Sequence, residues 1–173
     1  MKLSTMVIAA LLLAPATGAS AQGVTDAQIA SIVVTANQVD IDAGKLAKAQ
    51  STNGEVKKFA DLMITAHTGV NKSATELVTK LKVTPEDNPT SQSLKSGGDA
   101  NLKKLKGLSG VAFDKAYVDN EVAYHQAVLD AVDTTLVPSA KNAELKALLV
   151  KVRPTFVAHL EHAKHLQSSL GGK

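Results

Sequence analysis

Residues 56–81 read VKKFADLMITAHTGVNKSATELVTKL, and their spacing is that of an amphipathic helix. Apolar residues recur every three or four positions, which places them on one helix face. The members of this face are Val56, Phe59, Ala60, Met63, His67, Val70, Ala74, Leu77 and Leu81. His67 is its polar member. The pattern therefore predicts a helix that carries an imidazole into a helical core.

The same periodicity predicts three more long helices around this stretch. They cover approximately residues 25–50, 111–136 and 140–170. Pro154 is expected to kink or split the last of them, because proline removes a backbone donor and clashes with the preceding turn. No stretch alternates polar and apolar residues with β-branched enrichment, so we expect no sheet. The sequence predicts an all-α fold.

Two short connections arrange these helices into antiparallel hairpins. The first is the turn at residues 51–54, and the second is the break at Pro138. The connection between the hairpins, about residues 84–110, is expected to be a loop with a short extra helix over 99–106. It is long enough to travel the length of a bundle. Two hairpins joined by a long crossover form a ferritin-like four-helix bundle, whereas an up-down-up-down bundle stays open as the alternative.

A titratable side chain interrupts the apolar face of each predicted long helix. These side chains are Asp40, His67, Glu121 with His125 one turn later, and His159. A group of this kind loses its hydration in a helical core and must find a partner. Asp40 lies about 12 residues before the first turn and His67 about 14 after it, so a rise of about 1.5 Å per residue puts them at similar depth. Glu121 and His159 match in the same way in the second hairpin.

Two interpretations of these five groups stay open. Three imidazoles with one or two carboxylates could hold a single divalent ion such as Zn²⁺, Cu²⁺, Fe²⁺ or Mn²⁺. Alternatively, the chain is a non-catalytic envelope binding or stress protein, and the groups form a buried hydrogen-bond network in which Asp40 orients His67 and Glu121 orients His159. The residue types identify neither a reaction nor a substrate. They do not require that the protein is an enzyme.

His162 and His165 follow His159 in steps of three residues. Each step rotates the side chain by about 60° around the helix, so the three imidazoles cannot share one core. We expect His162 and His165 to be partly exposed.

Residues 1–21 have the pattern of a secretory signal peptide. Lys2, the apolar run over 7–14 and the small residues 19–21 predict cleavage after Ala21. The mature chain, residues 22–173, is then a single exported domain. The apolar run is too short to cross a bilayer, and no later stretch suits a transmembrane helix. The sequence contains no cysteine, which excludes disulfides and thiolate metal sites.

The composition argues against a nucleic-acid partner. The formal net charge is only +3, the basic residues form no stripe, and three Phe, two Tyr and no Trp offer no platform for stacking bases. A protein partner or a homo-oligomer stays open.

Several segments resemble the bacterial family of domain of unknown function 4142 (DUF4142). They are DIDAGKLA at 40–47, VKKFA at 56–60 leading to His67, FDKAY at 113–117 leading to His125, and Pro154 leading to His159. The resemblance implies a ferritin-like helical protein that is exported, lies in the periplasm or against the outer membrane, and has no assigned activity. Members are often labelled outer-membrane proteins.

The resemblance also implies an acid in the first helix, which Asp40 supplies, and a histidine in each later one, matching His67, His125 and His159. The family usually has an acid directly before the second-helix histidine, where this chain has Ala66. Di-iron ferritins place a glutamate three residues before a histidine on two helices, and this pairing occurs at no histidine here. A dinuclear ferroxidase centre is therefore not expected.

Overall fold

The computed structural model describes residues 23–171, whose regular structure is entirely helical, and this confirms the predicted all-α fold. The elements are α1 (Asp26–Gln50), α2 (Gly54–Leu81), α3 (Pro89–Lys106), α4 (Gly110–Ala131), the π-helical turn η1 (Val132–Leu136), α5 (Val137–Ser139) and α6 (Ala143–Gly171). The predicted signal peptide, residues 1–21, lies outside the described residues.

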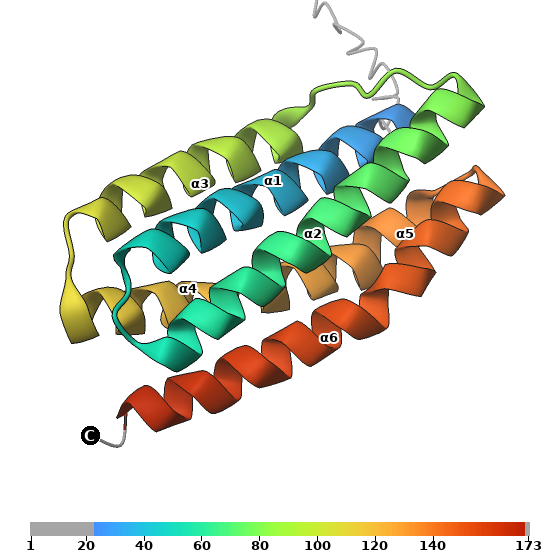
Figure 1. Ribbon diagram of the computed structural model, residues 1–173. Coiled ribbons are helices and arrows are strands. Elements are labelled where there is room, and N and C mark those ends of the chain that lie inside the picture. Colours follow the sequence, from blue (N-terminus) through green and yellow to red (C-terminus); the bar gives the residue numbers. More distant parts are fainter. Residues whose placement is uncertain (1–22, 172–173) are drawn as a thin grey trace, which may run out of the picture.

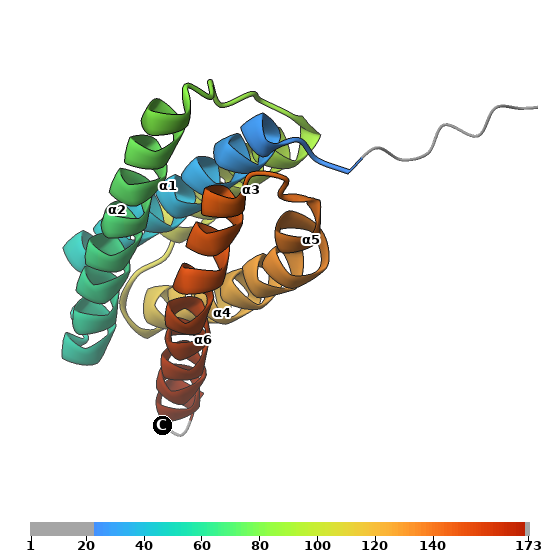
Figure 2. The ribbon, with the colours of Figure 1, turned by 90° about the vertical axis from the view of Figure 1, so that its right-hand side faces the viewer.

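The bundle consists of two antiparallel hairpins, α1 with α2 and α4 with α6 (Figures 1 and 2). Contacts at the two ends of α1 determine the direction in which the two hairpins run relative to each other. Asp26, at its start, accepts hydrogen bonds of 2.9 Å from the backbone N–H groups of Lys141 and Asn142, just before α6. Ser51, just after its end, donates a 2.6 Å hydrogen bond to Asp114 in the first turns of α4. Helices α2 and α4 therefore run parallel, which requires a crossover along the whole bundle.

That crossover is the helix α3, which packs along the outer side of α1 (Figure 1). The ferritin-like topology is thus confirmed, but the expected loop with a short helix over 99–106 is wrong, because residues 89–106 form one helix. Asn88 caps it by accepting hydrogen bonds of 3.1 Å from the backbone N–H groups of Thr90 and Ser91, and Pro89 presets the first turn.

A glycine allows α3 to approach α1 closely. A Cβ atom on Gly98 would lie 2.8 Å from both methyl groups of Val39. In the pair Gly97-Gly98, which is typical of a loop when seen in the sequence, Gly98 therefore serves helix packing. The expected split at Pro154 is also absent from the described residues, since α6 continues through this proline as one helix.

The two larger of the three apolar clusters in the described residues lie on either side of the middle of the bundle, and the third consists of Leu129, Phe156 and Leu160. One lies toward the α1–α2 turn and includes Phe59, Met63 and Tyr117. The other lies toward α5 and includes Ile29 and Leu149. Each large apolar side chain that is fully buried contributes about 1.5–3 kcal/mol to folding. The predicted polar positions fall between the two larger clusters.

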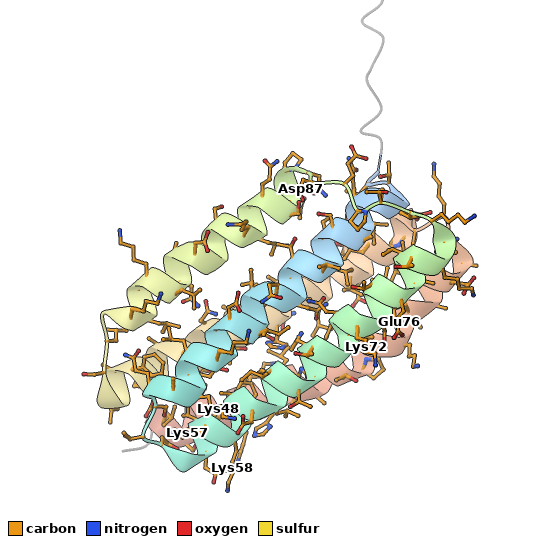
Figure 3. All side chains as sticks on the ribbon, turned by 45° about the horizontal axis from the view of Figure 1, so that its top comes forward. Lys48, Lys57, Lys58, Lys72, Glu76 and Asp87 are labelled. Carbon is orange, nitrogen blue, oxygen red and sulfur yellow. The ribbon has the colours of Figure 1, made fainter. Side chains whose placement is uncertain are left out.

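The outer faces of the helices are charged. Figure 3 shows Lys48, Lys57 and Lys58 extending outward around the α1–α2 turn, and all three are exposed. Among residues 23–171, no helix combines the length and the apolar character that crossing a membrane requires.

Candidate metal centre

The five titratable side chains predicted from the sequence meet in the middle of the bundle. Asp40 comes from α1, His67 from α2, Glu121 and His125 from α4, and His159 from α6. None is more than 3% exposed. The fold thus places three imidazoles and two carboxyl groups between its two larger apolar clusters.

These groups lie close enough to share a ligand. The ring centroids of His67, His125 and His159 are 5.3–5.6 Å apart. One nitrogen from each of these rings lies within 4.8 Å of the others, and the same holds for ligand atoms of Asp40, Glu121 and His125. His125 belongs to both groups and joins them into one cluster.

Asn37, one turn before Asp40 on α1, orients His67. Its side-chain nitrogen donates a 2.8 Å hydrogen bond to the carbonyl of Val33, so its oxygen faces the ring. Nδ1 of His67 donates to that oxygen at 2.7 Å. This places a proton on Nδ1, and Nε2 of the same ring lies 2.5 Å from Oδ2 of Asp40, close enough to share a proton with that carboxylate. The apolar pattern of the sequence does not single out Asn37, although it lies three residues before Asp40 and so on the same helix face.

His125 is oriented by the backbone of its own helix. Nδ1 of His125 lies 3.0 Å from the carbonyl oxygen of Glu121 and donates to it. Nε2 then carries the lone pair and lies 3.7 Å from Oδ2 of Asp40. Two imidazoles therefore direct their Nε2 atoms at the same carboxylate.

The hydrogen-bond network considered from the sequence is formed in part, because Oδ2 of Asp40 lies 2.5 Å from Nε2 of His67. Its other half is absent, since no hydrogen bond within residues 23–171 joins Glu121 to His159. Several buried side-chain atoms of the cluster have no hydrogen-bond partner in the described part of the chain. Apart from the close pair of Oδ2 of Asp40 and Nε2 of His67, they are Oδ1 of Asp40, both oxygens of Glu121, Nε2 of His125 and Nδ1 of His159.

Burial and mutual proximity separate the charge states of the two carboxyl groups. Burial raises the pKa of Asp40, but His67 and His125 beside it outweigh this and hold it below its ordinary value. Burial together with the negative charge of Asp40 raises the pKa of Glu121 well above its ordinary value. At neutral pH Asp40 is therefore ionised and Glu121 carries a proton.

The same environment favours neutral imidazoles on α4 and α6. Burial lowers the pKa of His125. Burial, with His67 and His125 nearby, lowers the pKa of His159 to about 4. Both rings are uncharged at neutral pH, which is the form that binds metal ions.

His162 and His165 lie outside this cluster. Both are exposed, as the sequence analysis predicts, and the ring of His162 packs edge-on against Phe59 at a centroid distance of 5.0 Å.

Comparisons with known proteins support the fold. A family profile described as a domain of unknown function, DUF4142, matches residues 12–166. No curated protein matches the chain. A solved structure from Streptomyces coelicolor that carries the label DUF305 superposes with a TM-score of 0.70 at 13% identity, covering 84% of this chain and 93% of that one. At this identity the similarity concerns the helical fold alone.

Proposed function

The chain belongs to the DUF4142 family, whose description assigns no activity, and we propose from the geometry that it binds one divalent transition-metal ion inside the bundle. His67, His125, His159 and Asp40 supply the ligands, and Glu121 is a fifth group at the same place.

The unpaired atoms of the cluster carry this proposal. Buried polar atoms in folded proteins nearly always have hydrogen-bond partners, and an exception calls for an explanation. Here both carboxyl groups and the imidazoles of His125 and His159 have an unpaired atom at the centre of residues 23–171. A structural network would pair these atoms with one another, whereas a metal site leaves their lone pairs for the ion. This favours the metal over the network.

The surroundings of two histidines also support the proposal. A histidine that binds a metal usually donates its other ring N–H to a carboxylate or carbonyl oxygen, which fixes the ring. Nδ1 of His67 donates to Asn37, and Nδ1 of His125 donates to the backbone of Glu121. Tetrahedral ligands about 2.0–2.1 Å from an ion lie about 3.3 Å apart. The distances from Oδ2 of Asp40, 2.5 Å to Nε2 of His67 and 3.7 Å to Nε2 of His125, lie on either side of that value.

The ligand types restrict the ion but do not select one. Imidazole with carboxylate suits Zn²⁺, Cu²⁺, Fe²⁺ and Mn²⁺, and the sequence has no cysteine that would favour a softer ion. A bound ion of this group supplies a positive charge that offsets the cost of burying Asp40.

Metal content tests the proposal. The protein is produced without a histidine tag, stripped with a chelator and reloaded separately with zinc and copper. We expect about one equivalent in the wild type and less than a tenth of that in H67Q and H159Q. H162Q removes an exposed imidazole from the same helix as His159 and should retain wild-type stoichiometry. Equal binding by wild type and H159Q would exclude the site.

Thermal unfolding provides a second readout. An ion that binds only the folded state raises the free energy of unfolding. Once its concentration exceeds the Kd, this gain grows with the logarithm of the concentration. Adding zinc should therefore raise the Tm of the wild type and of H162Q, but not the Tm of H67Q.

We also propose that the chain is exported. Residues 1–21 have the pattern of a signal peptide, and the name of the DUF305 protein from Streptomyces coelicolor includes the word secreted. Amino-terminal sequencing after cell fractionation should find Gln22 as the first residue, in the periplasm or with the outer membrane. A chain that keeps Met1 would contradict export by this route.

A further inference from the structure

A cavity of about 130 Å³ lies beside the histidine cluster, on the side toward α5. Aliphatic and aromatic side chains from α1, α4, η1 and α6 form most of its wall, including Ile32, Val128, Leu149 and Phe156. His67 and His125 also line it. The cavity therefore brings a largely apolar space into contact with two imidazoles of the candidate metal centre.

Apart from Thr90, which is an exposed residue, the polar groups in the wall have little left to offer a water molecule. The amide of Asn37 is engaged by His67 and by the carbonyl of Val33. The hydroxyl of Tyr124 donates a 2.8 Å hydrogen bond to the carbonyl of Ala36. The Nε2 atoms of His67 and His125 face Asp40. A buried water needs two to four polar partners, so this wall favours an apolar occupant over water.

An irregular turn of backbone shapes one end of the cavity. The π-helical turn η1 (Val132–Leu136) follows α4 directly, and both Val132 and Leu136 line the cavity. Single π-helical turns inside helices occur frequently at functional sites. This turn is a second and independent sign that the space is part of a site.

A surface groove of about 540 Å³ between α3 and α4 adjoins the cavity. It is lined by residues such as Pro89, Ser93 and Asn120. It shares Thr90, Leu94 and Tyr124 with the inner cavity. These three residues therefore lie between the surface groove and the space beside His67 and His125.

We propose that this cavity binds a small, uncharged, apolar molecule, up to about the size of benzene, against the imidazoles of His67 and His125. An apolar cavity of about 150 Å³ in another protein stays dry and takes up benzene or xenon, and the present one is similar in size and lining. A charged ligand would lose its hydration without gaining partners from these walls. The binding depends on the apolar walls and not on an ion, so the proposal goes beyond metal binding.

Xenon and benzene are the probes for this site. Crystals of the purified protein under xenon pressure should show an anomalous peak in contact with Phe156, and benzene should raise the Tm. Ala131 lines the cavity, and Ala123 is exposed on the same helix. A131L should remove the xenon peak and weaken benzene binding at least tenfold, whereas A123L should behave as the wild type. A36L fills the opposite wall and repeats the test if A131L does not fold.

Three results would overturn the proposal: no xenon peak in the wild type, ordered water filling the cavity, or undiminished benzene binding in both A131L and A36L. Zinc titration separates this site from the metal centre. A131L should keep its zinc affinity within about twofold, and H159Q should keep the xenon peak. Failure of either site therefore leaves the result for the other intact.

Discussion

Asn37 on α1 accepts a 2.7 Å hydrogen bond from Nδ1 of His67 on α2, across the first hairpin. The side-chain nitrogen of Asn37 in turn donates to the carbonyl of Val33 at 2.8 Å. The two bonds fix the amide and the ring together and direct Nε2 of His67 toward Asp40. Asn37 therefore positions a proposed ligand without binding the ion itself.

Replacing Asn37 by leucine tests this role. N37L keeps roughly the volume of the side chain but removes the acceptor for Nδ1, so the ring is free to rotate or to change tautomer. Loss of such an outer partner typically weakens metal binding about 10–100-fold. We expect a loss of that size for zinc, measured by competition titration, with unchanged helical circular dichroism. Q38L, at the exposed neighbouring position, is the control and should bind zinc as the wild type does. Wild-type affinity in N37L would remove Asn37 from the site.

The adjacent glycines of α3 give a matched pair for its packing on α1. A Cβ atom at Gly98 would meet the methyl groups of Val39 at 2.8 Å, whereas one at Gly97 would meet nothing within 4 Å. G97A should stabilise the protein by about 0.5–1 kcal/mol, because alanine has the higher helix propensity. G98A should lose that gain and cost about 1–3 kcal/mol through overpacking. Urea unfolding measures both values.

A double variant identifies the cause of that cost. If the clash is with Val39, then V39A should recover much of the stability that G98A loses. Equal stability of G97A and G98A would mean that α3 does not approach α1 as closely as the structure has it.

The close approach at Gly98 also explains which parts of the fold the sequence predicts. Helices α1, α2, α4 and α6 have long apolar faces, and the spacing of the apolar residues in the sequence predicts both the helix and its buried side. Helix α3 has Pro89 at its start and Gly97-Gly98 in its middle, so local propensity argues for a loop. Its stability comes from packing against α1, which is a tertiary effect that a local pattern does not contain.

The candidate site likewise contains some residues that the sequence predicts and some features that it does not predict. A charged or imidazole group on an apolar helix face is a strong local signal, and the five such groups do meet. Asn37 gives a weak signal, because asparagine is common on half-buried helix faces and its partner His67 lies on another helix. The π-helical turn η1 and the cavity depend on how α4 meets α6, and the sequence alone does not specify this.

Because Glu121 keeps its proton in the folded protein, we expect this side chain to lower the stability of the metal-free protein at neutral pH. Burial and the charge of Asp40 raise the pKa of Glu121 above its ordinary value of 4.5. For an acid with a raised pKa in the folded state, the folded protein binds the extra proton, so stability is lost as pH rises above 4.5. Glutamine cannot ionise and avoids this loss. E121Q should therefore stabilise the metal-free protein by about 1–3 kcal/mol at pH 7.

The pH dependence distinguishes this effect from better packing. The gain from E121Q should shrink toward zero as the pH is lowered to 4.5, because Glu121 is then protonated in the unfolded chain as well. Metal binding should weaken in the same variant. Denaturant unfolding from pH 4.5 to 8 measures the gain, and a gain that does not change with pH would contradict a neutral Glu121.

The lowered pKa of His159 predicts that the stability of the metal-free protein falls as the pH is lowered, which is the opposite of the trend expected for Glu121. Burial, with the neighbouring imidazoles, lowers its pKa from 6.5 to about 4. Between these values the unfolded chain binds a proton that the folded protein does not, so stability falls as the pH drops from about 6.5 toward 4. Glutamine at this position does not titrate. Relative to H159Q, the metal-free wild type should therefore lose up to about 3 kcal/mol over this range.

The exposed His162 provides the control, because H162Q should keep the wild-type profile. Some acid dependence should remain in H159Q, since burial also lowers the pKa of His125. Parallel curves for wild type and H159Q between pH 7 and pH 4 would contradict a buried neutral imidazole at position 159. A ring that is charged or solvated there would have its lone pair engaged by a proton or by water, and the case for His159 as a metal ligand would fall with it.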